Sequence, residues 1–160
     1  MKKLLITMTV NDEQFDLMVR PNETLTETLR ERLGLTGVKE GCAEGVCGAC
    51  AVLMDQHPVR ACLTLSMEAD GTSITTIEGL ASDGKLHHLQ ESFINHGAVQ
   101  CGFCTPGMIM VSKALLDEKP SPTDDEIKEA LSGNLCRCTG YKKILEAVRS
   151  TTQIDPKKGA

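Results

Sequence analysis

The chain reads Gly41-Cys42-Ala43-Glu44-Gly45-Val46-Cys47-Gly48-Ala49-Cys50 at the point that decides the fold of its first half. Three cysteines stand there in a C-x4-C-x2-C run, and Cys62 follows after eleven further residues. This is the spacing of plant-type [2Fe–2S] centres. The glycines between the cysteines allow positive φ angles and a close approach of the backbone to a bound group. The sequence therefore predicts a cluster-binding loop whose ligands are Cys42, Cys47, Cys50 and Cys62.

A zinc site is the main alternative for this first set of cysteines. Structural zinc favours two C-x2–4-C pairs that are well separated along the chain. Three cysteines within nine residues of a glycine-rich loop suit a diiron cluster better. A disulfide framework is not expected, because the sequence shows no secretory signal.

The other four cysteines, Cys101, Cys104, Cys136 and Cys138, form a C-x2-C pair followed much later by C-x-C. One residue between Cys136 and Cys138 is too few for a standard zinc knuckle, and Arg137 places a cation beside a net-negative cluster. Cys104 and Cys138 each stand at an expected helix start, where unpaired N–H groups favour a thiolate. These features favour a second cluster, while zinc, or a redox pair of Cys101 and Cys104, also fits the spacing.

Composition narrows the class of protein. A chain of 160 residues with 41% hydrophobic residues forms one domain or two small ones. A formal net charge of −5 without a basic stripe argues against a nucleic-acid partner. The apolar N-terminus breaks at residues 11–13, too early for a secretory signal, and no stretch has the length of a transmembrane helix. We expect a cytoplasmic protein, whose reduced cysteines bind metal or carry out redox chemistry.

Strand patterns dominate the first half of the chain. Residues 4–10 and 14–19 are expected to form a hairpin that turns at 11–13, residues 51–54 and 59–63 a second that turns at 55–58, and residues 72–77 a further strand. Thr24 and Glu27 predict a capping box that opens a helix ending near Gly34. A sheet with one helix and a cysteine loop is what a β-grasp, ferredoxin-like domain needs, and we assign it residues 1–79.

The second half changes to helical periodicity. Helices are expected near residues 86–96, 106–116, 123–131 and 140–148, with Gly97 as a C-cap and a capping box of Thr123 and Glu126. The second set of cysteines lies at the ends of these helices. We assign residues 80–160 to a four-helix domain that holds a second [2Fe–2S] cluster, so that the fold class is α+β.

Two longer stretches carry a family resemblance. The segments Gln100-Cys101-Gly102-Phe103-Cys104-Thr105-Pro106-Gly107 and Gly133-Asn134-Leu135-Cys136-Arg137-Cys138-Thr139-Gly140-Tyr141 resemble the paired signatures of the molybdenum hydroxylases. This family includes xanthine dehydrogenase, aldehyde oxidase and carbon monoxide dehydrogenase. The loop of residues 41–50, with Cys62, is similar to the family's ferredoxin-like domain. The resemblance runs from about Leu4 to Val148, and Ala51, where many relatives have Thr, is one small variation from it.

The resemblance implies an electron-transfer subunit that is not itself catalytic. In the split form of the family, a large subunit carries molybdopterin-bound molybdenum and hydroxylates the substrate, and a medium subunit usually carries FAD. Electrons would pass from molybdenum to the cluster of the helical domain, then to the ferredoxin-like cluster, then to the flavin. The resemblance also implies that Gln100 and the Cys138 side of the helical-domain cluster lie beside the pterin.

The substrate is expected to be an N-heteroaromatic such as a purine, for example xanthine, or nicotinate. The same role in an aldehyde or carbon monoxide dehydrogenase is an alternative, because the large subunit's pocket sets selectivity. Two alternatives come from other classes: a free two-cluster ferredoxin, and a structural zinc protein without a redox role.

Overall fold

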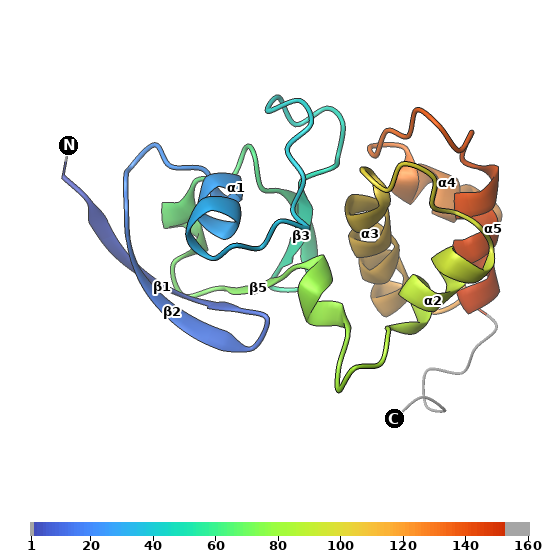
Figure 1. The fold of residues 1–160 in the computed structure, drawn as a ribbon, viewed down its shortest axis with the longest axis horizontal. Helices are drawn as coiled ribbons and strands as arrows, with labels where there is room; N and C mark the ends of the chain where they lie inside the picture. Colours follow the sequence, from blue (N-terminus) through green and yellow to red (C-terminus); the bar gives the residue numbers. More distant parts are fainter. Residues whose placement is uncertain (1, 153–160) are drawn as a thin grey trace.

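The structure is a computed structural model that describes residues 2–152 (Figure 1). The strands lie in the first half of the chain and the longer helices in the second. The strands are β1 (Leu4–Val10), β2 (Glu13–Val19), β3 (Ala51–Met54), β4 (His57–Arg60) and β5 (Ser73–Thr75). The helices are α1 (Leu25–Glu27), α2 (His88–Asn95), α3 (Thr105–Glu118), α4 (Asp124–Leu131) and α5 (Lys142–Thr151), with short turns of other helix types η1 (Thr28–Arg32), η2 (Ser66–Ala69) and η3 (Ile77–Leu80).

The strands form one mixed sheet in the order β2-β1-β5-β3-β4. β1 is antiparallel to β2 and parallel to β5, and β3 runs antiparallel to both of its neighbours. Ile6, Met8 and Val10 of β1 are buried, since successive side chains of a strand point to opposite faces. They pack with Leu25 and Leu29 in a core beneath the first helical segment.

Both hairpins turn more tightly than the sequence pattern predicts. The turns are the two residues Asn11-Asp12 and Asp55-Gln56, with φ angles of 50°, 67°, 48° and 70°. Positive φ at both central residues matches the twist of the flanking strands. The predicted turns at 11–13 and 55–58 are therefore in the right places but too long, because Glu13 already belongs to β2, and His57 and Pro58 to β4. β4 is an edge strand, which tolerates proline, and Cys62 lies beyond its end.

The predicted capping box at Thr24 is confirmed, but the helix after it is not a regular α-helix. The Thr24 hydroxyl accepts from the Glu27 N–H, and the Glu27 carboxylate accepts from the Thr24 N–H. From Thr28 to Arg32 the chain winds as a π-helix, and the Leu33 N–H donates to the Thr28 carbonyl at 3.2 Å. The leucine spacing does not distinguish the two windings.

Helices α2 to α5 surround a second core that includes Phe93, Met108, Ile127 and Ile144. Gly97 follows α2 with a φ of +62°, and Thr123 with Glu126 forms the predicted capping box of α4. Cys104 is the N-cap residue of α3, as expected. The expectation that Cys138 stands at a helix start is wrong, because α5 begins at Lys142, after Tyr141 in a left-handed conformation.

The two halves share a packed boundary at β3 and α3, which meet in the middle of the molecule (Figure 1). β3 is buried on both faces: Val52 belongs to the core of the sheet, and Ala51 and Leu53 belong to the core of the helices. This double burial fixes the cysteine loop that precedes β3 against the helices. Within residues 2–152, no helix has both the length and the apolar character needed to cross a membrane.

Candidate functional site: two sets of paired thiols

The first set of cysteines gathers around the loop that leads into β3. Cys50 directly precedes β3 and Cys62 follows β4, so the β3–β4 hairpin brings their Sγ atoms to 3.3 Å from each other. Both residues are buried. Cys42 and Cys47 lie in the loop itself, which projects beyond the sheet in Figure 1, and both are partly exposed. The set therefore has an inner and an outer pair.

Backbone donors in this loop favour a thiolate at Cys42. Its Sγ accepts from the N–H of Cys47 at 3.5 Å and from the N–H of Glu44 at 3.4 Å. These bonds lower the pKa of the Cys42 thiol to about 7. Burial instead raises the pKa of Cys50 to about 11, so that thiol ionises only with a compensating cation or metal beside it. A metal cluster bound to this set would supply that compensation for Cys50.

The second set joins two loops of the helical half. Cys101 and Cys104 lie between α2 and α3, and Cys136 and Cys138 lie between α4 and α5. The Sγ atom of Cys138 is 3.6 Å from that of Cys101 and 3.9 Å from that of Cys136. Burial raises the pKa of Cys104 to about 12, and the neighbouring thiol of Cys136 adds to this effect.

Thr139 favours a thiolate at Cys136. Its hydroxyl lies 3.0 Å from the Cys136 Sγ, and its N–H donates to the same sulfur at 3.5 Å. Burial alone would raise the pKa of Cys136, but these bonds outweigh it and lower the pKa to about 7. Each set thus contains one cysteine whose Sγ accepts hydrogen bonds and one whose thiol is buried away from water.

The arrangement of the thiols discriminates between the candidate metals. The closest Sγ contacts join Cys50 to Cys62 in the first set and Cys138 to Cys101 in the second. A structural zinc site needs four ligands around one point. A [2Fe–2S] cluster takes two ligands on each of its irons, so that paired thiols fit it. The donor chemistry and the pairing of both sets therefore fit [2Fe–2S] clusters better than zinc.

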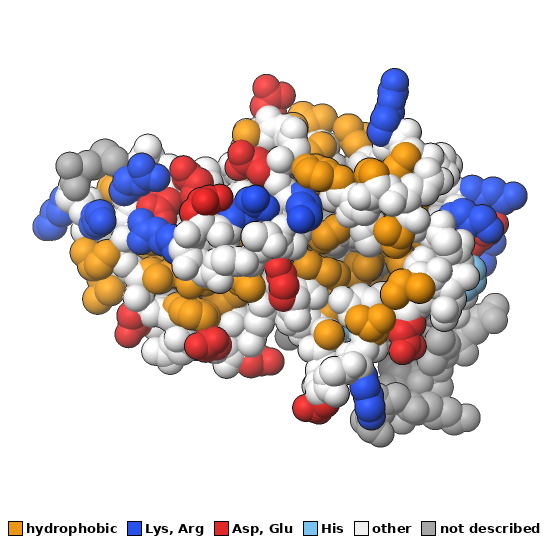
Figure 2. Space-filling view, viewed as in Figure 1, with side chains coloured by type: hydrophobic (Ala, Val, Ile, Leu, Met, Phe, Trp, Pro, Cys, Tyr) orange, Lys and Arg blue, Asp and Glu red, His pale blue; other side chains and the backbone are white. Residues whose placement is uncertain are grey.

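The outer part of the second set reaches the surface. Cys101 and Cys138 are exposed, and so is Gln100 beside them, which the resemblance places next to a pterin. Five exposed hydrophobic residues each lie within two positions of a cysteine in the sequence: Val46, Leu63, Val99, Phe103 and Leu135. On the face drawn in Figure 2, hydrophobic side chains gather over the helical half and its junction with the sheet.

Sequence reasoning missed a direct connection between the two sets. The N–H of Leu135, one residue before Cys136, donates to the carbonyl of Cys47 at 2.8 Å. The neighbouring side chain of Asn134 donates to the carbonyl of Gly48 at 3.2 Å. Asn134 stands in one of the two signature segments, but nothing in the local sequence indicates that it reaches a loop 86 residues away.

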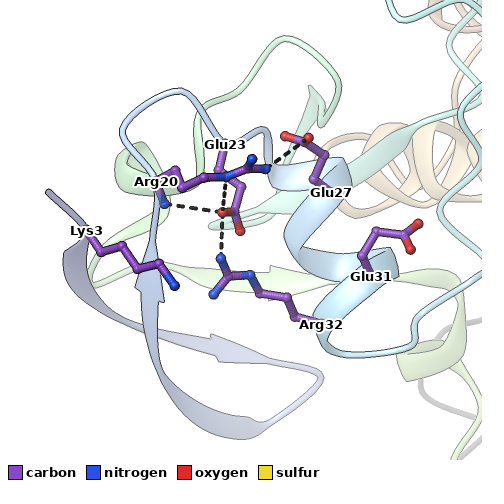
Figure 3. A pocket seen from close by; sticks show the side chains of 6 residues that line it. All are labelled: Lys3, Arg20, Glu23, Glu27, Glu31 and Arg32. Atoms are coloured by element: carbon purple, nitrogen blue, oxygen red, sulfur yellow. Dashed lines mark hydrogen bonds and ion pairs between the residues drawn. The ribbon is translucent and has the colours of Figure 1, made fainter. Parts of the chain in front are cut away.

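A charged hollow of about 220 Å³ lies at the sheet, away from the cysteines (Figure 3). Its lining residues are Lys3, Arg20, Glu23, Glu27, Glu31 and Arg32. The Glu23 carboxylate is buried and accepts hydrogen bonds from Arg32 at 2.6 Å and from the Thr28 hydroxyl at 2.8 Å. Desolvation opposes its ionisation, but the Thr28 and arginine contacts prevail and lower its pKa. This is a structural network whose carboxylate is already fully paired, and we assign it no ligand.

Comparison with known proteins places both halves among iron–sulfur domains. Residues 8–76 match the family described as "2Fe-2S iron-sulfur cluster binding domain", and residues 76–149 match "[2Fe-2S] binding domain". The chain is 55% identical over 149 residues to the nicotinate dehydrogenase small FeS subunit of Eubacterium barkeri, a match that covers 93% of this chain and 95% of that one. It is 54% identical over 155 residues to the nicotine 6-hydroxylase small subunit of Paenarthrobacter nicotinovorans, covering 96% and 93%.

Solved structures agree with these relatives. A chain of quinoline 2-oxidoreductase from Pseudomonas putida 86 superposes with a TM-score of 0.91 at 47% identity, covering 95% of this chain and 94% of that chain. The aldehyde oxidoreductase of Desulfovibrio gigas superposes with a TM-score of 0.89 at 44% identity, over 93% of this chain but only 17% of that one. In that second protein, the matching part is one segment of a much longer chain.

Proposed function

The chain belongs to the small iron–sulfur subunits of the molybdenum hydroxylases, and we propose that its eight cysteines hold two [2Fe–2S] clusters, one in each of two domains. It is an electron-transfer subunit of a heteromeric oxidoreductase, not the part that binds substrate. We assign residues 1–79 to a β-grasp, ferredoxin-like domain and residues 80–160 to a four-helix domain. The family matches meet at residue 76, close to this boundary.

The pairing of the thiols is the observation that carries the ligand assignment. In the first domain the ligands are Cys42, Cys47, Cys50 and Cys62, and in the second they are Cys101, Cys104, Cys136 and Cys138. Each cluster, when bound, accepts and releases one electron. The protein's part is to supply thiolates, to direct N–H groups at the sulfurs and to restrict water, which together set the potential.

The exposed end of the second set is the proposed contact with a large subunit that binds molybdopterin. Cys101, Cys138 and Gln100 reach the surface there, so a cofactor held by a partner can approach the cysteines closely. Phe103 and Leu135 are 46% and 52% exposed and add apolar area to that surface. The ferredoxin-like cluster would then pass electrons to FAD on a medium subunit, near the partly exposed Cys42 and Cys47.

We propose an N-heteroaromatic substrate for the complete enzyme, of the purine or nicotinate type. The support comes from the names of similar proteins: nicotinate, nicotine and quinoline all contain a nitrogen heteroaromatic ring. The aldehyde oxidoreductase is a similar protein with a different substrate class. The small subunit holds no substrate pocket in this proposal, so its residues do not choose between the two.

The test is purification of the chain from its native cell, with iron, molybdenum and flavin measured on the product. About four irons per chain, with molybdenum, FAD and two larger chains, is the expected result. Four irons without molybdenum or larger chains would instead establish a free ferredoxin. A colourless product that contains zinc would overturn the cluster assignment.

A further inference from the structure

We propose that Asn134 is a positioning residue for electron transfer between the two clusters. It belongs to residues 133–136, which we call the bridge segment because they connect Cys136 of the second set to the loop of the first. In this proposal the buried amide of Asn134 holds the bridge segment in the register that places Leu135 against Cys47. The inference rests on the proposed ligation of the clusters by the two sets of cysteines.

The bridge segment offers a short route through bonds from one set to the other. From the sulfur of Cys136, the covalent chain runs back across one peptide bond to the N–H of Leu135. That N–H donates to the carbonyl of Cys47 at 2.8 Å, and the covalent chain of Cys47 leads to its own sulfur. One hydrogen bond is thus the only non-covalent step between two proposed ligands.

Asn134 is buried beside this contact and holds it in place. It is 2% exposed, and its Nδ2 donates to the carbonyl of Gly48, the residue that follows Cys47. Gly48 has a φ of +72°, and a Cβ atom there would lie 2.6 Å from the Asn134 side chain. A Cβ on Gly107, in the first turn of α3, would lie 3.1 Å from the Asn134 Nδ2. Two glycines therefore leave the space that this one amide occupies.

The other half of the Asn134 amide makes no hydrogen bond to the described residues. Within the described part of the chain, no donor reaches the buried Oδ1 of Asn134. A buried acceptor without a partner is unfavourable, and an apolar side chain of the same shape would avoid that cost. The directed bond from Nδ2 to Gly48 is what Asn134 contributes in return.

Further bonds fix the rest of the bridge segment, so that a small shift at Asn134 acts on Leu135. The guanidinium of Arg60, from β4, donates to the carbonyl of Gly133 at 2.8 Å. The hydroxyl of Tyr141 donates to the carbonyl of Asn134 at 3.3 Å and accepts from the N–H of Cys136 at 2.9 Å. Arg60 ties the segment to the sheet, and Tyr141 ties it to its own loop.

The transfer itself moves one electron and no atoms. With both clusters bound, one electron would leave the cluster held by Cys136, oxidising it, and enter the cluster held by Cys47, reducing it. No covalent bond breaks and no proton moves. The rate at a given driving force then depends on the electronic contact between the two sets, which the bridge segment provides.

The experiment compares Asn134→Ala and Asn134→Leu with wild type in the purified complex with its partner subunits. Leu keeps the forked shape of the Asn side chain, in a larger volume, and removes the donor, while Ala removes the donor without adding bulk. Ser132→Ala is the matched control, because its exposed hydroxyl bonds only within its own helix end, to the Glu129 carbonyl. For each variant we would measure iron content, the midpoint potential of each cluster, their spin–spin splitting in electron paramagnetic resonance, and the delay between their reduction.

We expect both Asn134 variants to keep two clusters at unchanged potentials, with a weaker spin–spin splitting and a delay several-fold longer than in wild type. Ser132→Ala should match wild type in all four measurements. Full clusters with unchanged splitting and delay would overturn the proposal. Loss of iron in both Asn134 variants, but not in the control, would assign Asn134 to folding and would overturn it too. Wild-type protein without two cluster signals would instead overturn the proposed function.

Discussion

The Sγ atoms of Cys50 and Cys62 lie 3.3 Å apart because the β3–β4 hairpin returns the chain to its starting point. Ala51 pairs with Arg60 across this hairpin, and the two cysteines stand just outside that pair. The inner pair of the first set is therefore a consequence of strand pairing, whereas Cys42 and Cys47 depend on the conformation of a loop. The strand pairing of the sheet thus positions one side of the site.

The first prediction concerns the independence of the two sets. Cys62→Ser should lower the iron content from two clusters to one, because the first set loses a ligand and the second lies in other loops. The helical half should keep its fold, since Cys62 belongs only to the core of the sheet. Iron analysis with electron paramagnetic resonance measures this directly. Leu63→Ala, at an exposed neighbour, is the control and should keep both clusters. Two intact clusters in Cys62→Ser would contradict the ligand assignment.

The second prediction concerns the buried carboxylate of Glu23. Glu23→Gln should lower the free energy of unfolding by about 2 kcal/mol, because charge-assisted bonds from Arg32 and Thr28 are lost or weakened. Denaturant unfolding of the variant and wild type gives the difference. Glu31→Gln is the control in the same hollow: its side chain is 74% exposed, so its effect should stay within about 0.5 kcal/mol.

The stability difference between wild type and Glu23→Gln should also depend on pH, with a definite sign. The pKa of Glu23 is lowered in the folded protein, so its stabilising effect is complete above the ordinary value of 4.5. The effect is lost as the pH falls through the lower pKa of the folded state. The difference between wild type and Glu23→Gln should therefore be constant near neutral pH and shrink in acid. A difference that grows in acid would show that the network does not favour the ionised carboxylate.

The third prediction concerns His87, which caps α2 through its ring. Its Nδ1 accepts from the N–H of Leu89 at 3.3 Å, a bond that requires this nitrogen to be unprotonated. Burial, with His88 and Lys113 nearby, lowers the pKa of His87 to about 4. The folded state thus resists a proton that the unfolded chain accepts near pH 6.5. Stability contributed by neutral His87 is complete above that pH and is lost as the pH falls toward 4.

His87→Asn tests this dependence, because Asn also caps helices but does not titrate. Between pH 6.5 and pH 4, the free energy of unfolding of wild type should fall by about 1 kcal/mol relative to that of the variant. This value is reduced for the partial exposure of the ring. Thermal unfolding at several pH values measures it. Parallel pH curves for wild type and His87→Asn would contradict the assigned role.

Local sequence patterns predicted most of the helices and strands and all of the candidate cluster ligands. The strand pattern of β1, the capping boxes at Thr24 and Thr123, and the glycine after α2 are all signals within a few residues, and the structure confirms each of them. The cysteine spacing likewise led to the two sets, which the structure gathers separately. These features need no knowledge of the rest of the fold.

The features that sequence reasoning missed depend on contacts between distant segments. The π-helical turn at Thr28 accompanies bonds from its hydroxyl to Glu23 and to Ser66, and no local periodicity encodes the latter. The bond between Asn134 and Gly48 crosses the boundary of the two halves. It exists only because β3 and α3 pack against each other, which a pattern within one helix or one strand cannot show.

The last prediction tests that packed boundary at Gly107. Ala normally stabilises a helix interior by about 1 kcal/mol relative to Gly. At Gly107 of α3, however, a Cβ atom would collide with the carbonyl of Gly48, which is backbone and cannot rotate away. Gly107→Ala should therefore destabilise the protein by about 2 kcal/mol, because the loop of the first set must move away from α3. Thermal or denaturant unfolding gives the size of the effect.

A second glycine separates this collision from simple backbone strain. Gly84 has a φ of +74° with no atom within 4 Å of its Cβ position, so Gly84→Ala introduces strain without a collision. Gly84→Ala should lower the free energy of unfolding by about 1 kcal/mol. The spectrum of both clusters should stay unchanged. Gly107→Ala should instead also weaken the spin–spin splitting, since it displaces Gly48 and with it Cys47. A stabilised Gly107→Ala variant would mean that the first loop does not press on α3, and the close contact between the two sets would then lack its support.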